Sequence, residues 1–314
     1  MISYPFTDPI INIQCGQLSL IRTTGLVPPR DTQPMPTTCT YRINAINLLI
    51  CQMRLDFIQF AIGEPTVDAI DPNAAYPRCN GDHLKVGDVT LCGENSGQHV
   101  YIPINPMQGE RQLTINIVSN GNGNGARPNW RIAVHQLECP FGQTRSMNAV
   151  QPVSKVSEVL RSPRTLVSDW LAPTGCLQYF AMPTGQIESF NFKNGAGPYI
   201  GNMNYAICFR RGRANTQLKL ITTTFIMNNG NPTNDGFNDD CQDLARTPRR
   251  SEDYLSIPNA MTSDSIGARL FCGRSLMSKI VTSTPPGPFT VVFNSDQQYA
   301  PAEEIGFRMQ YEIV

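Results

Sequence analysis

The stretch Cys51-Gln-Met-Arg-Leu-Asp-Phe-Ile-Gln-Phe60 decides the fold class of this chain. Its apolar residues alternate with Arg54 and Asp56, the period-two pattern of a β-strand that has one face on a core and the other in water. Residues 307–313 show the same pattern near the end of the chain. Between them lie many short apolar segments punctuated by Gly, Pro and Asn, so we expect an all-β sandwich fold.

The segment before this stretch, residues 39–43, alternates in the same way. We expect the two segments to form an antiparallel pair that turns through residues 44–47, which would place Cys39 opposite Cys51. Facing positions on adjacent strands fall within the Cα separation that a disulfide permits. Further along, the Asn-Gly steps of residues 120–125 favour positive φ and predict a hairpin turn.

A weaker version of the same plan returns in the second half of the chain. The corresponding segments are 39–41 and 204–209, 82–86 and 253–257, and 91–93 and 271–273. A repeat of this length indicates two domains of one kind, which also suits a chain of 314 residues. We expect an extended lead-in at residues 1–38 and a first domain at 39–139. A linker at 140–175, with a short helix over 153–160, would then lead to a second domain at 176–314.

Three phrases are specific enough to suggest a family: Cys51-Gln-Met-Arg-Leu-Asp-Phe57, Cys92-Gly-Glu-Asn-Ser-Gly-Gln-His-Val-Tyr101 and Gly175-Cys-Leu-Gln-Tyr-Phe180. With the later Val291-Val-Phe-Asn-Ser-Asp296 they resemble the CUB domain, and more narrowly the tandem CUB proteins that insects and other arthropods secrete. The resemblance covers most of the chain. It implies two CUB-like jelly-roll β-sandwiches in tandem, stapled by disulfides.

The ten cysteines include no Cys-x-x-Cys pair, so we interpret them as disulfides formed in an oxidising compartment. The resemblance implies one disulfide in each domain, the expected hairpin predicts another, and a further bond would join the end of the first domain to the start of the second. The bonds implied by the resemblance are Cys79–Cys92 and Cys241–Cys272. The hairpin predicts Cys39–Cys51, and the bond between the domains would be Cys139–Cys176. Cys15 and Cys208 are left unassigned.

Ordinary CUB domains imply a different pairing at two of these places, and the sequence alone does not choose between the two schemes. The competing pairs are Cys15–Cys39 and Cys176–Cys208, with Cys51 and Cys139 left over. Only the first scheme contains a bond that would hold the two domains at a fixed angle.

Many CUB domains bind calcium, and the resemblance implies ligands for it in the second domain. Asp253 and Asp296 stand at two of the matching positions, and Asp235, Asp239 or Asp240 could supply another. Calcium takes several oxygen ligands, mostly carboxylates, that converge from different loops. Calcium is therefore a candidate cofactor of this domain.

In the first domain Glu64 and Asp82 match the family's ligand positions. Residues 119–122 replace the Ser-Asp of the family, so a main ligand is missing there. The alternative for all these carboxylates is that they are loop residues whose oxygens accept hydrogen bonds from turn amides.

Three basic clusters could bind sulfated glycans or acidic proteins. They are Arg210, Arg211 and Arg213 in an expected hairpin turn, Arg249 and Arg250 in a long insert of the second domain, and Arg161 and Arg164 in the linker. The pair in the insert could also be a protease site. Solvated loops are the competing interpretation, and the formal net charge of zero favours it.

The composition and motifs argue against several classes of function. Lys and Arg number 25 and Asp and Glu 25, so no overall field attracts nucleic acid or an anionic membrane. No apolar run is long enough to span a bilayer. No Ser lies in a Gly-x-Ser-x-Gly setting and the histidines, His83, His99 and His135, are scattered, so we expect no enzyme and interpret His99 as structural.

We therefore expect a secreted, extracellular, non-enzymatic adhesion or interaction protein whose partner is an extracellular protein or glycan. Two other functions stay open: the non-catalytic regulatory part of a secreted protease precursor, and a self-assembling extracellular structural protein that would form homo-oligomers. Residues 1–6 lack the apolar core of a signal peptide, so we expect the mature part of a secreted precursor.

Overall fold

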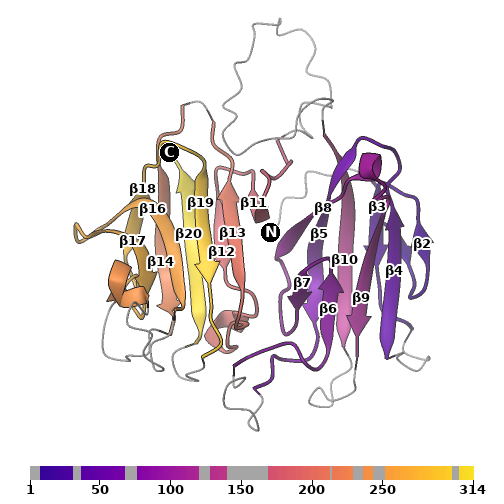
Figure 1. Cartoon of the computed structure of the whole chain (residues 1–314), viewed down its shortest axis with the longest axis horizontal. Helices are drawn as coiled ribbons and strands as arrows, with labels where there is room; N and C mark the ends of the chain where they lie inside the picture. The colour runs from indigo at the N-terminus through magenta and orange to yellow at the C-terminus, as the bar shows by residue number, and fades with distance from the viewer. Residues whose placement is uncertain are drawn as a thin grey trace, which may run out of the picture.

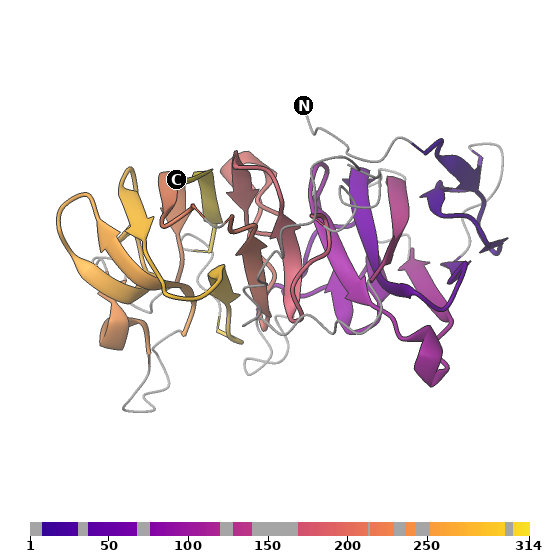
Figure 2. The same ribbon diagram turned by 90° about the horizontal axis from the view of Figure 1, so that it is seen from above.

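The structure is a computed structural model of the chain, and it is almost entirely β. The residues that it describes are 8–30, 37–67, 76–119, 128–139, 169–212, 214–228, 236–242, 252–298 and 304–314. They form two β-sandwiches that lie side by side, one from β1 to β10 and one from β11 to β20 (Figure 1, Figure 2). We call them the N-terminal sandwich and the C-terminal sandwich.

The N-terminal sandwich consists of two five-stranded sheets, with the strand orders β1-β3-β10-β5-β8 and β2-β4-β9-β6-β7. The first sheet contains β1 (Ile11–Ile13), β3 (Thr23–Leu26), β10 (Asn129–Glu138), β5 (Ile50–Ala61) and β8 (His99–Pro103). The second contains β2 (Leu18–Ser19), β4 (Thr38–Asn44), β9 (Gln112–Val118), β6 (His83–Val86) and β7 (Val89–Leu91), and the 3-10 helix η1 (Pro106–Gln108) precedes β9. β1, β2 and β3 lie in the segment that we expected to be an extended lead-in.

The C-terminal sandwich follows the strand path β11-β13-β19-β16-β18-β14-β20-β12, with β17 paired to both β15 and β16. Its strands are β11 (Cys176–Phe180), β12 (Thr184–Glu188), β13 (Asn204–Phe209), β14 (Leu218–Ile226), β15 (Gly236–Phe237), β16 (Tyr254–Thr262), β17 (Gly267–Cys272), β18 (Ile280–Ser283), β19 (Phe289–Asn294) and β20 (Gly306–Ile313), with the 3-10 helices η2 (Lys193–Gly195) and η3 (Asn238–Cys241). β16 passes between the layers, because residues 254–256 pair with β19 and residues 260–262 pair with β18.

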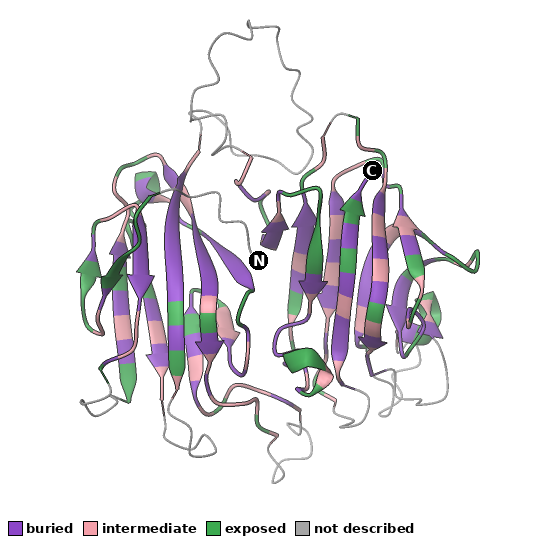
Figure 3. Cartoon of the chain, turned by 180° about the vertical axis from the view of Figure 1, so that it is seen from behind, coloured by how far each residue is buried: buried purple, intermediate pink, exposed green. Residues whose placement is uncertain are grey.

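The core forms where the apolar faces of the strands meet. Bands of buried and exposed residues alternate along many strands (Figure 3). In the N-terminal sandwich the indole N–H of the buried Trp130 donates to the Tyr41 hydroxyl at 3.0 Å, and that hydroxyl donates to the carbonyl of Val27. Buried aromatic groups with polar ends are stable inside a core when those ends are bonded in this way. The expected all-β sandwich class is confirmed.

The prediction that residues 39–43 and 51–60 form a hairpin is wrong. β4 pairs with β9 and β2, whereas β5 pairs with β10 and β8, so the two strands lie in opposite sheets. Alternation shows which face of a strand is buried, but it does not show which strand lies beside it. For the same reason β9 and β10 form no hairpin around residues 120–125, and β13 and β14 form none around Arg210 and Arg211.

Five disulfides use all ten cysteines. The pairs are Cys15–Cys39, Cys51–Cys139, Cys79–Cys92, Cys176–Cys208 and Cys241–Cys272. The expected Cys39–Cys51 bond is wrong, because Cys39 lies opposite Ile117 of β9, in the other sheet. The expected Cys139–Cys176 bond is wrong too, because the register of β5 and β10 brings Cys51 to Cys139, with a Cα–Cα distance of 5.7 Å. Every disulfide lies within one sandwich, so none joins the two.

Candidate functional site

The face of β5 that the sequence predicted to be in water is buried. Arg54 is 4% exposed and Asp56 is 2% exposed. β8 and β10 flank β5 and add polar side chains to the same face, because His99 is the register partner of Asp56, and Tyr101 and His135 are register partners of Arg54. The C-terminal sandwich and the segment that leads into it cover this face, which a solitary sandwich would leave in water.

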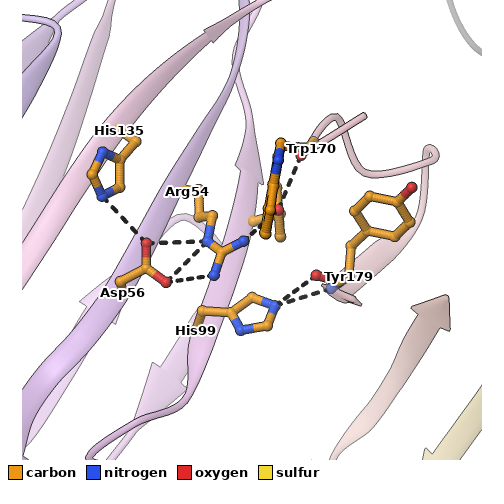
Figure 4. Close-up of polar contacts among 7 residues, drawn as sticks. Arg54, Asp56, His99, His135, Trp170 and Tyr179 are labelled. Atoms are coloured by element: carbon orange, nitrogen blue, oxygen red, sulfur yellow. Dashed lines mark hydrogen bonds and ion pairs between the residues drawn. The ribbon is translucent and has the colours of Figure 1, made fainter. Parts of the chain in front are cut away.

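A charge-balanced pair occupies the centre of this face (Figure 4). The Arg54 guanidinium donates to Asp56 through Nε, at 2.9 Å and 3.1 Å from the two carboxylate oxygens, and through Nη2 at 2.6 Å. His135 Nε2 lies 3.3 Å from the same carboxylate. Burial alone would raise the pKa of the Asp56 carboxyl, but the charge of Arg54 and the hydrogen bond from His135 hold that pKa well below its usual range.

The same side chains hold the segment that precedes β11. Arg54 Nη1 donates to the Tyr101 hydroxyl at 3.0 Å, and that hydroxyl donates to the carbonyl of Trp170 at 3.0 Å. The guanidinium carbon also lies 5.3 Å from the centre of the Trp170 ring, within the range of a cation–π contact. Beside them, Gln52 exchanges two hydrogen bonds with the backbone of Ala172, at 2.6 Å and 3.0 Å.

His99 contacts the edge strand of the C-terminal sandwich directly. Its Nε2 lies 3.0 Å from the carbonyl oxygen of Tyr179 and 3.2 Å from the Tyr179 amide nitrogen (Figure 4). Burial and the neighbouring charge of Arg54 lower the pKa of the His99 imidazole to about 3. The expectation that His99 is structural agrees with this position, but nothing in the sequence indicated what it would contact.

An apolar cluster surrounds these polar contacts and draws on both sandwiches. It contains Tyr101 and Leu137 from one side, Leu171, Ala172 and Tyr179 from the other, and the Cys51–Cys139 and Cys176–Cys208 disulfides. We call the whole contact between the two sandwiches the inter-sandwich interface; its centre is formed by Gln52, Arg54, Asp56, His99, Tyr101 and His135 on one side and by residues 170–172 and Tyr179 on the other. Beneath this cover Arg54 and Asp56 bond to each other, and His99 contacts the backbone of Tyr179.

A second part of the inter-sandwich interface joins two turns. The side chain of Asn95 accepts a hydrogen bond from the Asn191 amide at 2.8 Å, and the Asn191 side chain accepts one from the Glu94 amide at 3.0 Å. Gly93 has a φ of +78°, and a Cβ there would lie 2.0 Å from Asn191 Oδ1. Glycine is therefore required at this position for the backbone conformation and for the close approach.

The structure gives the predicted ligands of the first domain other surroundings. Glu64 accepts an ion-pair hydrogen bond from Lys193 of the C-terminal sandwich, at 2.9 Å. Asp82 is buried at 2% exposed and packs against Gly63, where a Cβ would lie 2.9 Å from the Asp82 Cβ. Glu64 therefore contributes to the rim of the inter-sandwich interface.

The predicted ligands of the second domain, Asp253 and Asp296, do come together. The Asp253 carboxylate accepts the amide of Asp296 at 2.6 Å and the hydroxyl of Tyr199. The Asp296 carboxylate accepts the amides of Glu252 at 2.7 Å and Gln298 at 2.6 Å. These bonds to turn amides are the ones that the alternative interpretation predicted.

Three further residues border this pair and were missed by the sequence reasoning. The Tyr199 hydroxyl accepts the amide of Asn228 at 3.1 Å, and the Asn228 side chain donates to Glu304 at 3.2 Å. Burial, followed by the charges of Asp253 and Glu304, raises the pKa of Tyr199 well above its usual value. These residues are far apart in the sequence and belong to no common motif, so no sequence signal groups them.

The third carboxylate of the predicted set does not complete a metal centre. Asp240 lies on η3, where its carboxylate accepts the amide of Phe237 at 3.3 Å. In the part of the chain that the structure describes, no group of three or more His, Cys, Asp or Glu side chains is arranged to hold a metal ion. Asp235 lies outside the described residues.

The two described arginines of the basic cluster after β13, Arg210 and Arg211, bond to other residues of the protein. Arg211 donates to the carbonyls of Asn215 at 3.1 Å and Pro285 at 2.7 Å and to that of Gly287, and its guanidinium lies 4.6 Å from the Phe289 ring centre. Arg210 forms a partly exposed ion pair with Asp169 at 2.9 Å. The predicted loop residues Arg213, Arg249 and Arg250, and the predicted helix over 153–160, lie outside the described residues.

The described residues also include no helix long and apolar enough to cross a membrane.

Comparisons with known proteins point to one family for the second half of the chain. Residues 173–314, which include the whole C-terminal sandwich, match the family model of the animal CUB domain. No curated protein matches the chain.

Several solved structures show a low similarity to the chain. The CUB1-EGF-CUB2 domains of rat MASP-1 share 14% identity, over 97% of this chain and 100% of that one, with a TM-score of 0.28. The MASP-1 CUB2 domain bound to Ca2+ shares 22% identity, over 38% of this chain and 98% of that one, with a TM-score of 0.25. The extracellular region of zebrafish Gpr126/Adgrg6 shares 7% identity, over 96% of this chain and 36% of that one, with a TM-score of 0.28.

Proposed function

We propose that this chain is a secreted, non-enzymatic interaction protein of arthropod type, in which two CUB-like domains act together on an extracellular protein or glycan. CUB domains typically mediate protein interactions, and residues 173–314 match that family. The observation that carries the proposal is the closed inter-sandwich interface. Its base, acid and cation, His99, Asp56 and Arg54, are 5%, 2% and 4% exposed and bond within the protein.

The same interface supports the idea that the domains, proposed at 39–139 and 176–314, work as one unit. Polar bonds at its centre and interlocking turns at its edge define one relative orientation of the sandwiches. Loops on a rigid scaffold are the usual carriers of binding function. Loops from both sandwiches would then be presented to one partner, and the affinity would depend on their relative position.

Binding of the intact, oxidised chain to arrays of extracellular proteins and sulfated glycans tests this function. We expect saturable binding to a partner, which Gly93→Ala weakens about tenfold or more because it displaces the sandwiches. Gly109→Ala is the matched control, because Gly109 also has positive φ, at +98°, but a Cβ there meets nothing within 4 Å. Equal binding by both variants would contradict the shared action. Catalytic turnover that is lost in His99→Gln would contradict the non-enzymatic function.

The proposal includes calcium at the C-terminal sandwich. Asp253 and Asp296 would supply carboxylate oxygens to it, and their bonds to turn amides and to Tyr199 would fix the positions of those oxygens. A hard cation there would tie the loops that carry these residues and stiffen that end of the sandwich. Thermal unfolding in calcium and in EDTA tests this part.

A further inference from the structure

The two sandwiches are held together by non-covalent contacts. All ten cysteines are used in disulfides, and each disulfide closes within one sandwich. Separation of the sandwiches at the inter-sandwich interface would therefore break no covalent bond. The chain itself would keep them tethered, so closure would be an intramolecular equilibrium.

His99 is a titratable side chain that is buried between the two sandwiches. Its ring is 5% exposed, with ring centres 5.6 Å from Tyr101 on its own strand and 4.9 Å from Phe180 across the interface. Its Nε2 faces the backbone of Tyr179, whose amide points away from the ladder of its own sheet. The imidazole therefore covers polar groups of an edge strand that separation would expose to water.

The charged and titratable groups around His99 come from four strands. β5 supplies Arg54 and Asp56, β8 supplies Tyr101, β10 supplies His135 against Asp56, and β11 supplies Tyr179. Within this cluster Asp56 is the one carboxylate, and it already accepts three hydrogen bonds from Arg54. A proton on His99 would place a second cation beside Arg54 in a region closed to water.

We propose that protonation of His99 releases the inter-sandwich interface, so that the two sandwiches are docked near neutral pH and separate more often in acid. A buried cation without its own counter-charge is strongly unfavourable, whereas the same cation in an opened interface is hydrated. Separation exposes the polar face of β5 and the edge of β11. The inference does not depend on calcium or on the identity of a partner.

The direction of the pH effect follows from the pKa of His99. It is about 3 in the docked state and returns toward the ordinary value of about 6.5 when the interface opens. The docked state then binds fewer protons, so docking has its full strength above about pH 6.5 and weakens as the pH falls toward 3. The docking constant should fall about tenfold per pH unit in this window, which is about 100-fold at pH 4.5.

Amide hydrogen exchange on the intact, oxidised chain tests the inference. The probe is the Tyr179 amide, which bonds to His99, and the reference is the Leu220 amide within the C-terminal sandwich, with each rate corrected for the intrinsic pH dependence of exchange. We expect the protection of Tyr179 relative to Leu220 to fall about 100-fold between pH 7.5 and pH 4.5. A fall of less than about threefold in the wild-type chain would overturn the proposal.

Variants assign the effect to one histidine. In His99→Gln the amide oxygen of Gln can accept the Tyr179 amide without titrating, so the fall should disappear. His83→Gln is a control on β6, where His83 bonds to the carbonyl of Gly81. His135→Gln removes the other histidine of the cluster. Both variants should keep the fall in protection. A fall that persists in His99→Gln, or that disappears only in His135→Gln, would overturn the proposal. If His99→Gln does not fold, the wild-type and His135→Gln measurements still decide it.

Discussion

Asp56 in the inter-sandwich interface and Asp253 in the C-terminal sandwich are buried to nearly the same degree, at 2% and 1% exposed. Asp56 accepts hydrogen bonds from the Arg54 guanidinium, whereas Asp253 accepts hydrogen bonds from the backbone amide of Asp296 and from the Tyr199 hydroxyl. The ion pair balances charge between two neighbouring side chains of β5, while the turn amide and the Tyr199 hydroxyl hold the oxygens of Asp253 in place. The first arrangement neutralises charge in the closed inter-sandwich interface, and the second fixes the directions of carboxylate oxygens.

The largest effect should come from removal of one partner of the ion pair. Arg54→Met leaves the Asp56 carboxylate buried without its main donor, and should lower the free energy of unfolding by about 3–5 kcal/mol. The double variant Arg54→Met with Asp56→Leu should lose less than Arg54→Met alone, because no unpaired charge remains. Denaturant unfolding of the oxidised chain measures both. A larger loss in the double variant would show that the pair does not balance itself.

Calcium should have the next largest effect, at the other carboxylate. At a calcium concentration 100 times the dissociation constant, the C-terminal sandwich should be stabilised by about 2.7 kcal/mol relative to EDTA. Asp296→Asn and Asp253→Asn should abolish that shift, and Asp264→Asn, in a loop where Asp264 pairs with Lys279, should keep it. Calorimetric melting in both buffers provides the comparison. An unshifted wild-type chain would remove calcium from the account.

The contact between the turns of Gly93 and Asn191 should contribute less to stability than the Arg54–Asp56 ion pair or calcium. Gly93→Ala should cost about 2 kcal/mol more than Gly109→Ala in the free energy of unfolding. Both substitutions put a side chain at positive φ, but only the first meets Asn191, so the difference isolates the close approach. Urea unfolding of the two variants measures it. Equal losses of unfolding free energy in the two variants would show that Gly93 does not lie as close to Asn191 as in the structure.

The ion pair at the rim should have the smallest effect. Lys193 and Glu64 have side chains that are 48% and 36% exposed, so water and salt screen their interaction. A double-mutant cycle with Lys193→Ala and Glu64→Ala should give a coupling of at most about 1 kcal/mol, decreasing with added salt. A larger coupling that does not depend on salt would contradict the solvent exposure of this ion pair.

The fold class was predictable because alternation is a local property of the sequence. The pattern around Arg54 and Asp56 identified β5 as a strand and identified its apolar face. It did not reveal that β4 lies in the opposite sheet, because the partner of a strand is decided by the whole topology, and the Cys39–Cys51 pairing failed with it. The cover on the polar face also escaped prediction, since it comes from residues more than a hundred positions away.

The candidate site at the C-terminal sandwich was predictable in part. The resemblance to CUB domains indicated Asp253 and Asp296, which the structure places within hydrogen-bond contact. Tyr199, Asn228 and Glu304 complete their surroundings but belong to no motif that connects them. Positions fixed by a family pattern transfer through the sequence, whereas neighbours supplied by folding do not.

The titration of the His99 imidazole in the intact, oxidised chain, followed by NMR, tests the closed inter-sandwich interface most directly. We expect no titration of His99 between pH 7.5 and pH 5, because its pKa is lowered to about 3 in the docked state, and we expect a nuclear Overhauser contact between the His99 ring and the Tyr179 amide. A midpoint at the ordinary value of about 6.5 without that contact would contradict the account. The two sandwiches would then be separate in solution at neutral pH.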